Sequence, residues 1–393
     1  MIRSKIFTML AKIRVFILLT LISLLPTLLI WLPFFIRIEK LWGIPLPKEG
    51  MATVVANYDG PLFLVVAKTL YNPPEIEKYG FGLPNEYYAA HFPLYPALIR
   101  LLSPLVGYPY SMLFITAGSS VLAIYFFYRF IEGFVERKDL LWITLVFSLL
   151  PARWLIVRSV GSAEPLFLAT IIASVYYFKQ KKFLLAGFWG FLAQLTKSPA
   201  ILLFIAYIFA YFYPKLKELG EHPANKLIKP SEIKNFLYLF LIPLGLLVVF
   251  YIFKIRFNDL FAYFHSGDNI HLFFPPFQIF NYSQPWVGTF WLEEVIFVYL
   301  FGLLGLMKLI RMKEHTLAWF VGIYFISILF VSHRDIIRYA LPIIPFLFAA
   351  FADTISKNEF KYAMLILIIP VYLFSLAYMS QNVMPISDWG PLL

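Results

Sequence analysis

The chain has 393 residues, of which 61% are hydrophobic, 20% are aromatic and only 14% are charged. Soluble domains carry about 25% charged residues, so this composition excludes an ordinary soluble protein. The chain has no cysteine, which excludes disulfides and thiolate metal sites. Its net charge of +11 is explained by the positive-inside bias of membrane proteins, without a nucleic-acid partner. It has no P-loop or dinucleotide-binding glycine pattern and no HExxH zinc motif.

Long apolar runs predict an all-α polytopic membrane protein with about eleven transmembrane helices. The basic N-terminus precedes the first run without a small-residue cleavage site, so we expect that helix to be retained. In chain order, the expected helices are Val15–Ile36, Tyr110–Ile131, Leu140–Trp154, Glu164–Phe178, Phe183–Leu195, Pro199–Tyr213, Phe236–Phe253, Trp291–Leu309, Thr316–Val331, Tyr339–Phe351 and Tyr362–Met379.

The positions of lysine and arginine predict the orientation of these helices. With a cytoplasmic N-terminus, the internal segments hold about 20 of the 33 basic residues. This topology leaves two long external loops, residues 37–109 and 254–290. Short helices over Pro61–Leu70 and Phe92–Ser103 are expected to lie in the membrane interface. Residues 1–393 are predicted to form a single integral-membrane domain with no separate soluble domain.

Polar residues in otherwise apolar surroundings fall on the external side of this topology. They are Asp59, Arg153, Arg158, Glu164, Lys197, Asp259, His265, Asp268, His271, His333, Arg334, Asp335 and Arg338. Carboxylates beside cations at an external interface suit group transfer from a lipid phosphate. The cations hold the phosphate and stabilise its charge as it leaves, and a carboxylate takes the proton of the acceptor hydroxyl.

Each of these residues also has a plainer interpretation. Asp59 precedes Gly60 and Pro61, where it could serve only to start a helix. Glu164 begins a predicted helix, where a carboxylate is favoured by the helix dipole. The basic residues could extend to lipid headgroups, as lysine and arginine near helix ends often do. His265 and His271 fit a solvated loop, and Asp268 in the "SGDN" segment fits a turn.

Several segments resemble, in order, the motifs of mannosyltransferases of the PIG-V type (GPI mannosyltransferase II and its prokaryotic relatives). They are "NYDGPLFLVVAKTLYN", "HFPLYPALIRLLSP", "LPARWLIVRSVGSAEPLFLA", "LAQLTKSPAIL", "FNDLFAYFHSGDNI" and "HRDIIRYALPIIPFLF". The chain departs from the family pattern at Asn57-Tyr58, where Arg-Trp is usual, at Gly161–Ala163 before Glu164, and at Lys197 and Pro199, where Arg and Asn are common.

The resemblance implies an integral-membrane glycosyltransferase of the GT-C fold class. The implied donor is a polyprenyl- or dolichyl-phosphate sugar, with mannose as the expected sugar, and the acceptor is a glycolipid or glycan. Asp59 matches the position of the general base and Glu164 that of a second acid. The remaining matched or neighbouring residues are expected to bind substrate, namely Tyr58, His91, Tyr95, Arg158, Lys197, His333, Arg334 and Arg338. Tyr95 also fits an architectural role in "HFPLYP".

No metal and no cofactor are predicted, and the expected partners are the lipid-linked donor, the acceptor and membrane lipid, with no nucleic acid. The expected location is a prokaryotic cell membrane, with the active site facing outside. Three alternatives remain open: transfer of a different lipid-phosphate-linked sugar, a lipid or glycan flippase without transferase activity, and a non-enzymatic subunit of a glycosylation complex.

Overall fold

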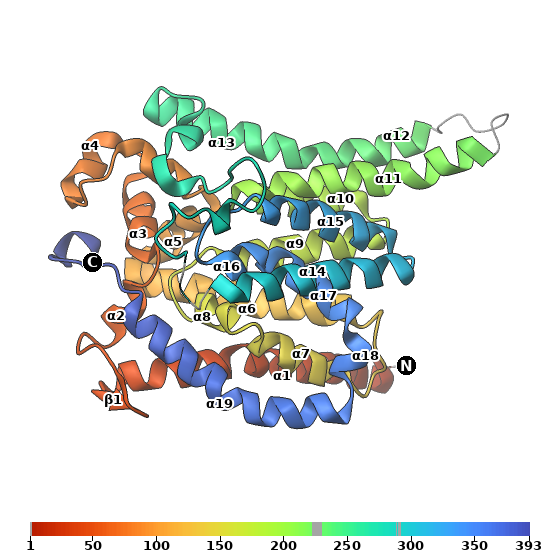
Figure 1. Ribbon diagram of the computed structural model, residues 1–393, viewed down its shortest axis with the longest axis horizontal. Coiled ribbons are helices and arrows are strands. Elements are labelled where there is room, and N and C mark those ends of the chain that lie inside the picture. Colours follow the sequence, from red (N-terminus) through yellow and green to blue (C-terminus); the bar gives the residue numbers. More distant parts are fainter. Residues whose placement is uncertain (1, 222–229, 288, 290–291) are drawn as a thin grey trace. The chain divides into compact units, whose positions relative to one another are not determined.

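The computed structural model describes residues 2–221, 230–287, 289 and 292–393 (Figure 1). The protein is mostly helical, and the chain forms two compact units. Unit 1 consists of Met1–Lys68, Tyr95–Ala169 and Ala352–Leu393, and unit 2 consists of Thr69–Leu94 and Thr170–Phe351.

Unit 1 is built around four helices, α1, α6, α7 and α19. Helix α1 packs against α6 and α7, and α19 packs against α8. The C-terminal ends of α1 and α19 and the N-terminal end of α6 lie at the same end of the unit (Figure 1). The elements wholly or largely in unit 1 are α1 (Ile2–Phe35), β1 (Lys40–Leu41), β2 (Ile44–Pro45), α2 (Met51–Val55), α3 (Gly60–Thr69), α5 (Leu94–Val106), α6 (Tyr108–Ile131), α7 (Leu140–Leu149), α8 (Ala152–Arg158), the first turns of α9 (Glu164–Lys179), α18 (Ala352–Ile355), α19 (Asn358–Gln381) and η10 (Gly390–Leu392).

Unit 2 is a bundle in which α10 packs against α13, and α15 packs against both α11 and α14. A Cβ added at Gly187 in α10 would lie 2.1 Å from the backbone oxygen of Tyr238, so glycine permits this close approach. Unit 2 contains the rest of α9, together with α4 (Pro73–Ile76), η1 (Glu77–Tyr79), η2 (Asn85–Ala90), α10 (Phe183–Gln194), η3 (Ser198–Ala200), α11 (Ile201–Glu221), α12 (Pro230–Leu237), η4 (Tyr238–Phe240), α13 (Leu241–Phe257), η5 (Ala262–His265), η6 (Gly267–Asn269), η7 (Gln278–Phe280), α14 (Glu293–Arg311), α15 (His315–Leu329), α16 (Ile336–Ala340), η9 (Leu341–Ile343) and α17 (Ile344–Ala350).

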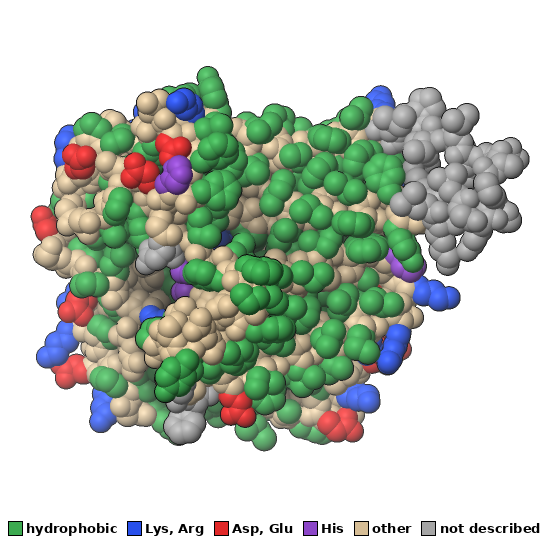
Figure 2. All heavy atoms as spheres, turned by 45° about the horizontal axis from the view of Figure 1, so that its top comes forward, with side chains coloured by type: hydrophobic (Ala, Val, Ile, Leu, Met, Phe, Trp, Pro, Cys, Tyr) green, Lys and Arg blue, Asp and Glu red, His purple; other side chains and the backbone are tan. Residues whose placement is uncertain are grey.

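The protein is a multi-pass membrane protein. Within the described residues, four stretches are helical, long and apolar enough to cross a bilayer, and they are Lys12–Phe35, Tyr108–Ile131, Lys234–Phe257 and Asn358–Gln381. Large apolar side chains are exposed on several helices, and Figure 2 shows hydrophobic side chains across the visible surface. On α13 they include Leu247 and Ile255, at 63% and 62% exposure. Such faces suit contact with lipid acyl chains.

Every predicted span coincides with one or more helices of the structure, but the count of about eleven spans stays a prediction. The predicted helix Leu140–Trp154 is wrong as a single element, because the structure has α7 and α8 there, bent by 75°. Pro151 lies at the break, where it cannot donate a helical hydrogen bond. This pair adds a possible fifth span.

Two loop boundaries can also be compared. The first predicted loop, residues 37–109, matches the segment between α1 and α6 closely, and it contains α3 and α5 near the predicted short helices. The second was predicted to begin at residue 254, but α13 continues to Phe257 and ends at Asn258, which has a left-handed φ of 55°. Lys254 donates a hydrogen bond to the Asn258 side chain at 2.9 Å, so this basic residue belongs to the helix end. The predicted loop end at residue 290 and the predicted helix start at Trp291 lie outside the described residues.

Candidate active site

Tyr58 and Asp59 form a tight turn between α2 and α3 in unit 1. Tyr58 has a left-handed φ of 49°, and a Cβ added at Gly60 would lie 2.3 Å from the backbone oxygen of Val55. The Asp59 carbonyl accepts the N–H of Phe63 at 3.0 Å, which starts α3. Asp59 is half-buried, so part of the residue remains accessible to solvent. These backbone contacts therefore define the turn from which the Asp59 side chain projects.

The segment after α19 holds this turn in place. The fully buried Asn57 side chain donates to the Met379 carbonyl at 2.7 Å. The Tyr58 N–H donates to the Asn382 carbonyl at 3.4 Å, and the Met384 N–H donates to the Ala56 carbonyl at 2.8 Å. Asn57, one of the departures from the family pattern, thus has a structural role here, as the link between the turn and the end of α19.

Arg153 in α8 supports the same turn from another side. It is buried, at 4% exposure, and its Nη1 donates to the Tyr58 hydroxyl at 3.2 Å. Its guanidinium lies 3.8 Å from the centre of the Tyr378 ring, and the Tyr58 and Tyr378 rings are 5.7 Å apart. The sequence placed Arg153 among the external polar residues without giving it a role, and the structure places it against Tyr58.

Replacing Arg153 with alanine is expected to destabilise the protein by about 2 kcal/mol, because it removes a desolvated cation–π contact, a hydrogen bond and buried side-chain packing. The measurement is the thermal unfolding midpoint of the purified protein in detergent. Arg153→Lys keeps the positive charge but lacks the planar guanidinium, so its unfolding midpoint should lie between those of wild type and Arg153→Ala. The control is Arg129→Ala, which removes an exposed arginine paired with Glu132 at 3.2 Å. An unchanged midpoint for Arg153→Ala would contradict the supporting role.

Glu164 lies at the start of α9 and belongs to a buried hydrogen-bonded chain. The Ser162 hydroxyl donates a hydrogen bond to its carboxylate, and the Glu164 N–H lies 3.3 Å from the same hydroxyl oxygen, so Ser162 forms a local turn at the start of α9. The Ser162 N–H lies 3.4 Å from the Thr116 hydroxyl, which lies 2.6 Å from that of Tyr95. At 2% exposure, Glu164 is held in a position that favours the helix-starting interpretation.

Tyr95 is fully buried at the other end of this chain. Burial raises the pKa of its phenol, so the hydroxyl stays protonated and able to donate. Its ring packs edge-on against Phe63 in α3, with 4.9 Å between ring centres. The structure thus brings together two predicted site residues, Tyr95 and Glu164, and links them by packing to the helix that follows Asp59. These contacts favour the architectural role for Tyr95.

Arg158 is fully buried at the end of α8. Its Nη2 donates to the Ser23 carbonyl of α1 at 2.6 Å, and its guanidinium lies 5.3 Å from the centre of the Trp154 indole. Among the described residues, its Nε and Nη1 have no hydrogen-bond partner. The side chain does not extend toward the surface as the headgroup interpretation requires. Its role as a phosphate ligand stays a prediction.

The remaining predicted substrate-binding residues lie in unit 2. His91 is buried, and its carbonyl accepts the Tyr71 hydroxyl at 2.5 Å. Lys197 is half-buried in the turn between α10 and α11. His333 Nδ1 accepts the Asp335 N–H at 2.9 Å, Arg334 is exposed and Arg338 is half-buried in α16.

The second long loop contributes to the cluster around His333. The Ser332 N–H donates to the His271 carbonyl at 2.9 Å, and the His271 and His333 rings are 4.4 Å apart. His265 instead is exposed and pairs with Asp259 at 2.5 Å, which lowers the pKa of that carboxyl. The Asp268 backbone lies in η6. The substrate-binding roles in unit 2 stay predictions.

The sequence matches no protein-family profile and no curated protein. The structure is similar to the crystal structure of the Archaeoglobus fulgidus oligosaccharyltransferase tethered to an acceptor peptide that contains the NVT sequon. The TM-score is 0.49 at 14% sequence identity, and the match covers 94% of this chain and 56% of that chain. This chain therefore spans little more than half the length of the archaeal protein.

Proposed function

We propose that the protein is an integral-membrane glycosyltransferase of the GT-C class. It would move a sugar, with mannose as the first candidate, from a polyprenyl- or dolichyl-phosphate donor to an acceptor hydroxyl on the extracytoplasmic side, with inversion at the anomeric carbon. The observation that carries this proposal is the Tyr58–Asp59 turn. A half-buried carboxylate stands at the start of a helix, and the turn that bears it is fixed by Asn57 and Arg153.

In this reaction the oxygen of the acceptor hydroxyl attacks the anomeric carbon of the donor sugar, and Asp59 takes the proton of that hydroxyl. The bond from that carbon to the phosphate oxygen breaks, and the lipid phosphate leaves with the electron pair. A carboxylate on a well-supported turn suits this step, because the efficiency of a base depends on its placement relative to the attacking oxygen. The proposed phosphate ligands are the exposed Arg334 and the half-buried Lys197 and Arg338, whose charge would stabilise the leaving phosphate.

The test is transfer of labelled mannose from polyprenyl-phosphate-mannose in membranes of a strain that expresses the chain, compared with the same strain without it. Label in a new product supports the proposal. If this donor gives no transfer, the assay is repeated with polyprenyl-phosphate-linked glucose and arabinofuranose. No transfer from any of the three donors would contradict the proposed function. If the protein in liposomes moves the lipid-linked sugar from one leaflet to the other without transferring it, the flippase alternative would be favoured.

A further inference from the structure

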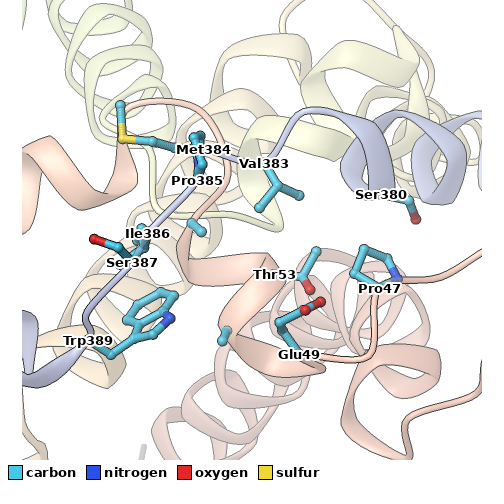
Figure 3. Close-up of a pocket in the computed structure, with 12 residues that line it drawn as sticks. Pro47, Glu49, Thr53, Ser380, Val383, Met384, Pro385, Ile386, Ser387 and Trp389 are labelled. Atoms are coloured by element: carbon cyan, nitrogen blue, oxygen red, sulfur yellow. The ribbon is translucent and has the colours of Figure 1, made fainter. Parts of the chain in front are cut away.

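A pocket of about 530 Å³ lies within unit 1, between the segment that leads to the Tyr58–Asp59 turn and the segment that follows α19. We call it the Trp389 pocket. Figure 3 shows Trp389 on one side of the hollow and Glu49 with Thr53 on the other. Ala56 and Pro385 also line it. Its volume is within the roughly 300–1,000 Å³ typical of small-molecule sites.

Two polar groups of this pocket, those of Glu49 and Thr53, lack partners in the described part of the protein, whereas the Ser380 hydroxyl donates to the Leu376 carbonyl at 2.8 Å. The Thr53 hydroxyl is buried, with its side chain only 1% exposed, and it has no hydrogen-bond partner there. The Glu49 carboxylate is exposed and forms neither a hydrogen bond nor an ion pair with the described residues. Buried hydroxyls are normally hydrogen-bonded, so this wall is suited to a polar ligand.

Trp389 provides a different kind of surface. Its indole is half-buried, and within the described ranges no other ring stacks against it and no group hydrogen-bonds to it. A tryptophan combines a large apolar face with one N–H donor, so it suits a ligand that is apolar on one face and polar at its edge. The pocket therefore offers an aromatic face opposite a carboxylate and a hydroxyl.

This combination fits a sugar ring. The C–H face of a pyranose can pack on the indole, while its hydroxyls donate to the Glu49 carboxylate and exchange hydrogen bonds with Thr53. Glu49 would repel a phosphate, which disfavours the lipid phosphate of the donor as the occupant. The chemistry points to a neutral sugar unit.

One wall of the pocket belongs to the segment that leads into the Tyr58–Asp59 turn. Ala56 lines it, three residues before Asp59, and its carbonyl accepts the Met384 N–H at 2.8 Å. The far end of the C-terminal segment is also fixed, because Lys68 Nζ donates to the Pro391 carbonyl at 2.6 Å. The segment after α19, which forms one wall, is thus hydrogen-bonded both to Ala56 before the turn and to Lys68 in α3 after it.

We infer that the Trp389 pocket binds a sugar unit of the acceptor glycan. The acceptor assignment rests on the proposed transferase function, whereas the saccharide-binding site itself does not. The pocket holds one sugar of the acceptor while another hydroxyl of the same glycan approaches Asp59. Glu49, Thr53 and Trp389 would then determine which acceptor is used.

Binding is tested first, without any donor. The full chain in detergent is titrated with mannotriose and with glucose- and galactose-terminated trisaccharides, and binding is followed by saturation-transfer NMR and calorimetry. Wild type should bind at least one of them, Trp389→Ala should bind it about tenfold more weakly, and Trp389→Phe should retain most of the affinity. The control is Trp42→Ala, which removes an exposed tryptophan of the same unit, at 79% exposure. Absence of saccharide binding by wild type, or equal affinity in Trp389→Ala, would overturn the site.

Kinetics then separate this inference from the proposed function. With an active donor, Trp389→Ala and Glu49→Gln should raise the KM for the acceptor about tenfold and leave the KM for the donor unchanged. A raised donor KM with an unchanged acceptor KM would overturn the acceptor assignment. The protein could bind a saccharide in a way that depends on Trp389 and yet transfer no sugar from any lipid donor. That result would support the binding site and refute the transferase proposal.

Discussion

Replacing Asp59 with asparagine is expected to lower the rate of sugar transfer by roughly 10²–10⁴-fold while the protein remains folded. Asparagine keeps the shape of the side chain but cannot take a proton from the acceptor hydroxyl. The substitution also separates the two interpretations of Asp59, because asparagine starts helices about as well as aspartate does. A residue that only starts α3 would tolerate the change. The measurement is the initial rate of transfer at matched protein levels, together with the thermal unfolding midpoint.

The matched control for this variant is Glu39→Gln. Glu39 is an exposed acid in the same predicted loop, 3.9 Å from Lys48, and its neutralisation should leave the rate within about twofold of wild type. If Asp59→Asn also stays within twofold of wild type, Asp59 is not the base. If it loses its folded structure as well as its activity, the rate cannot be assigned to proton transfer, and Asp59→Glu, which restores a carboxylate, becomes the deciding variant.

The substitution Gly60→Ala is expected to lower transfer by about 10²-fold although every polar group of the site remains. The added Cβ would lie 2.3 Å from the Val55 carbonyl oxygen, and a backbone atom cannot rotate away as a side chain can. The turn must therefore move, and a displacement of about 1 Å at a reacting group can cost about 10²-fold in rate. The strain should also destabilise the protein by about 1–3 kcal/mol. Both the transfer rate and the unfolding midpoint are measured.

Gly118→Ala provides the comparison for this second variant. Gly118 lies within α6 of the same unit, and a Cβ there would have no neighbouring atom within 4 Å. Its substitution should leave transfer unchanged and raise stability slightly, because alanine is the better helix former. Full activity and an unchanged midpoint in Gly60→Ala would show that the turn relaxes without moving Asp59, and the requirement for close packing would be wrong.

The helices were largely predictable because they depend on local composition. A run of apolar residues flanked by loops predicted Tyr110–Ile131, and α6 covers Tyr108–Ile131. The prediction failed where one residue acts through the backbone, as Pro151 does between α7 and α8. It also failed at the end of α13, where Lys254 and Arg256 looked like loop residues but lie in the last turn of the helix.

The site was predictable only in part, for a related reason. The Asp59 motif and the start of α9 at Glu164 are local in sequence, and the Ser162–Glu164 contact spans only two residues. The support for the turn is not local. Asn57 binds the carbonyl of a residue 322 positions later, and Arg153 reaches Tyr58 across 95 positions. No short sequence pattern contains both partners of such a contact. Neither the Asn57 contact nor the Arg153 contact could therefore be expected from one sequence.

The link between Asn57 and the end of α19 sets an order of events during biosynthesis. Translation delivers the turn early, but Met379 follows Asn57 by 322 residues. Until the ribosome has made that segment, the Asn57 amide can donate to the Thr53 carbonyl but not to that of Met379, and the Ala56 carbonyl lacks the Met384 N–H. The turn that bears the proposed base therefore gains these contacts only when α19 and the segment after it have been made. A nascent chain that has not yet reached α19 would carry the Asp59 motif without the contacts that fix its turn, so we expect it to be inactive in the proposed transfer.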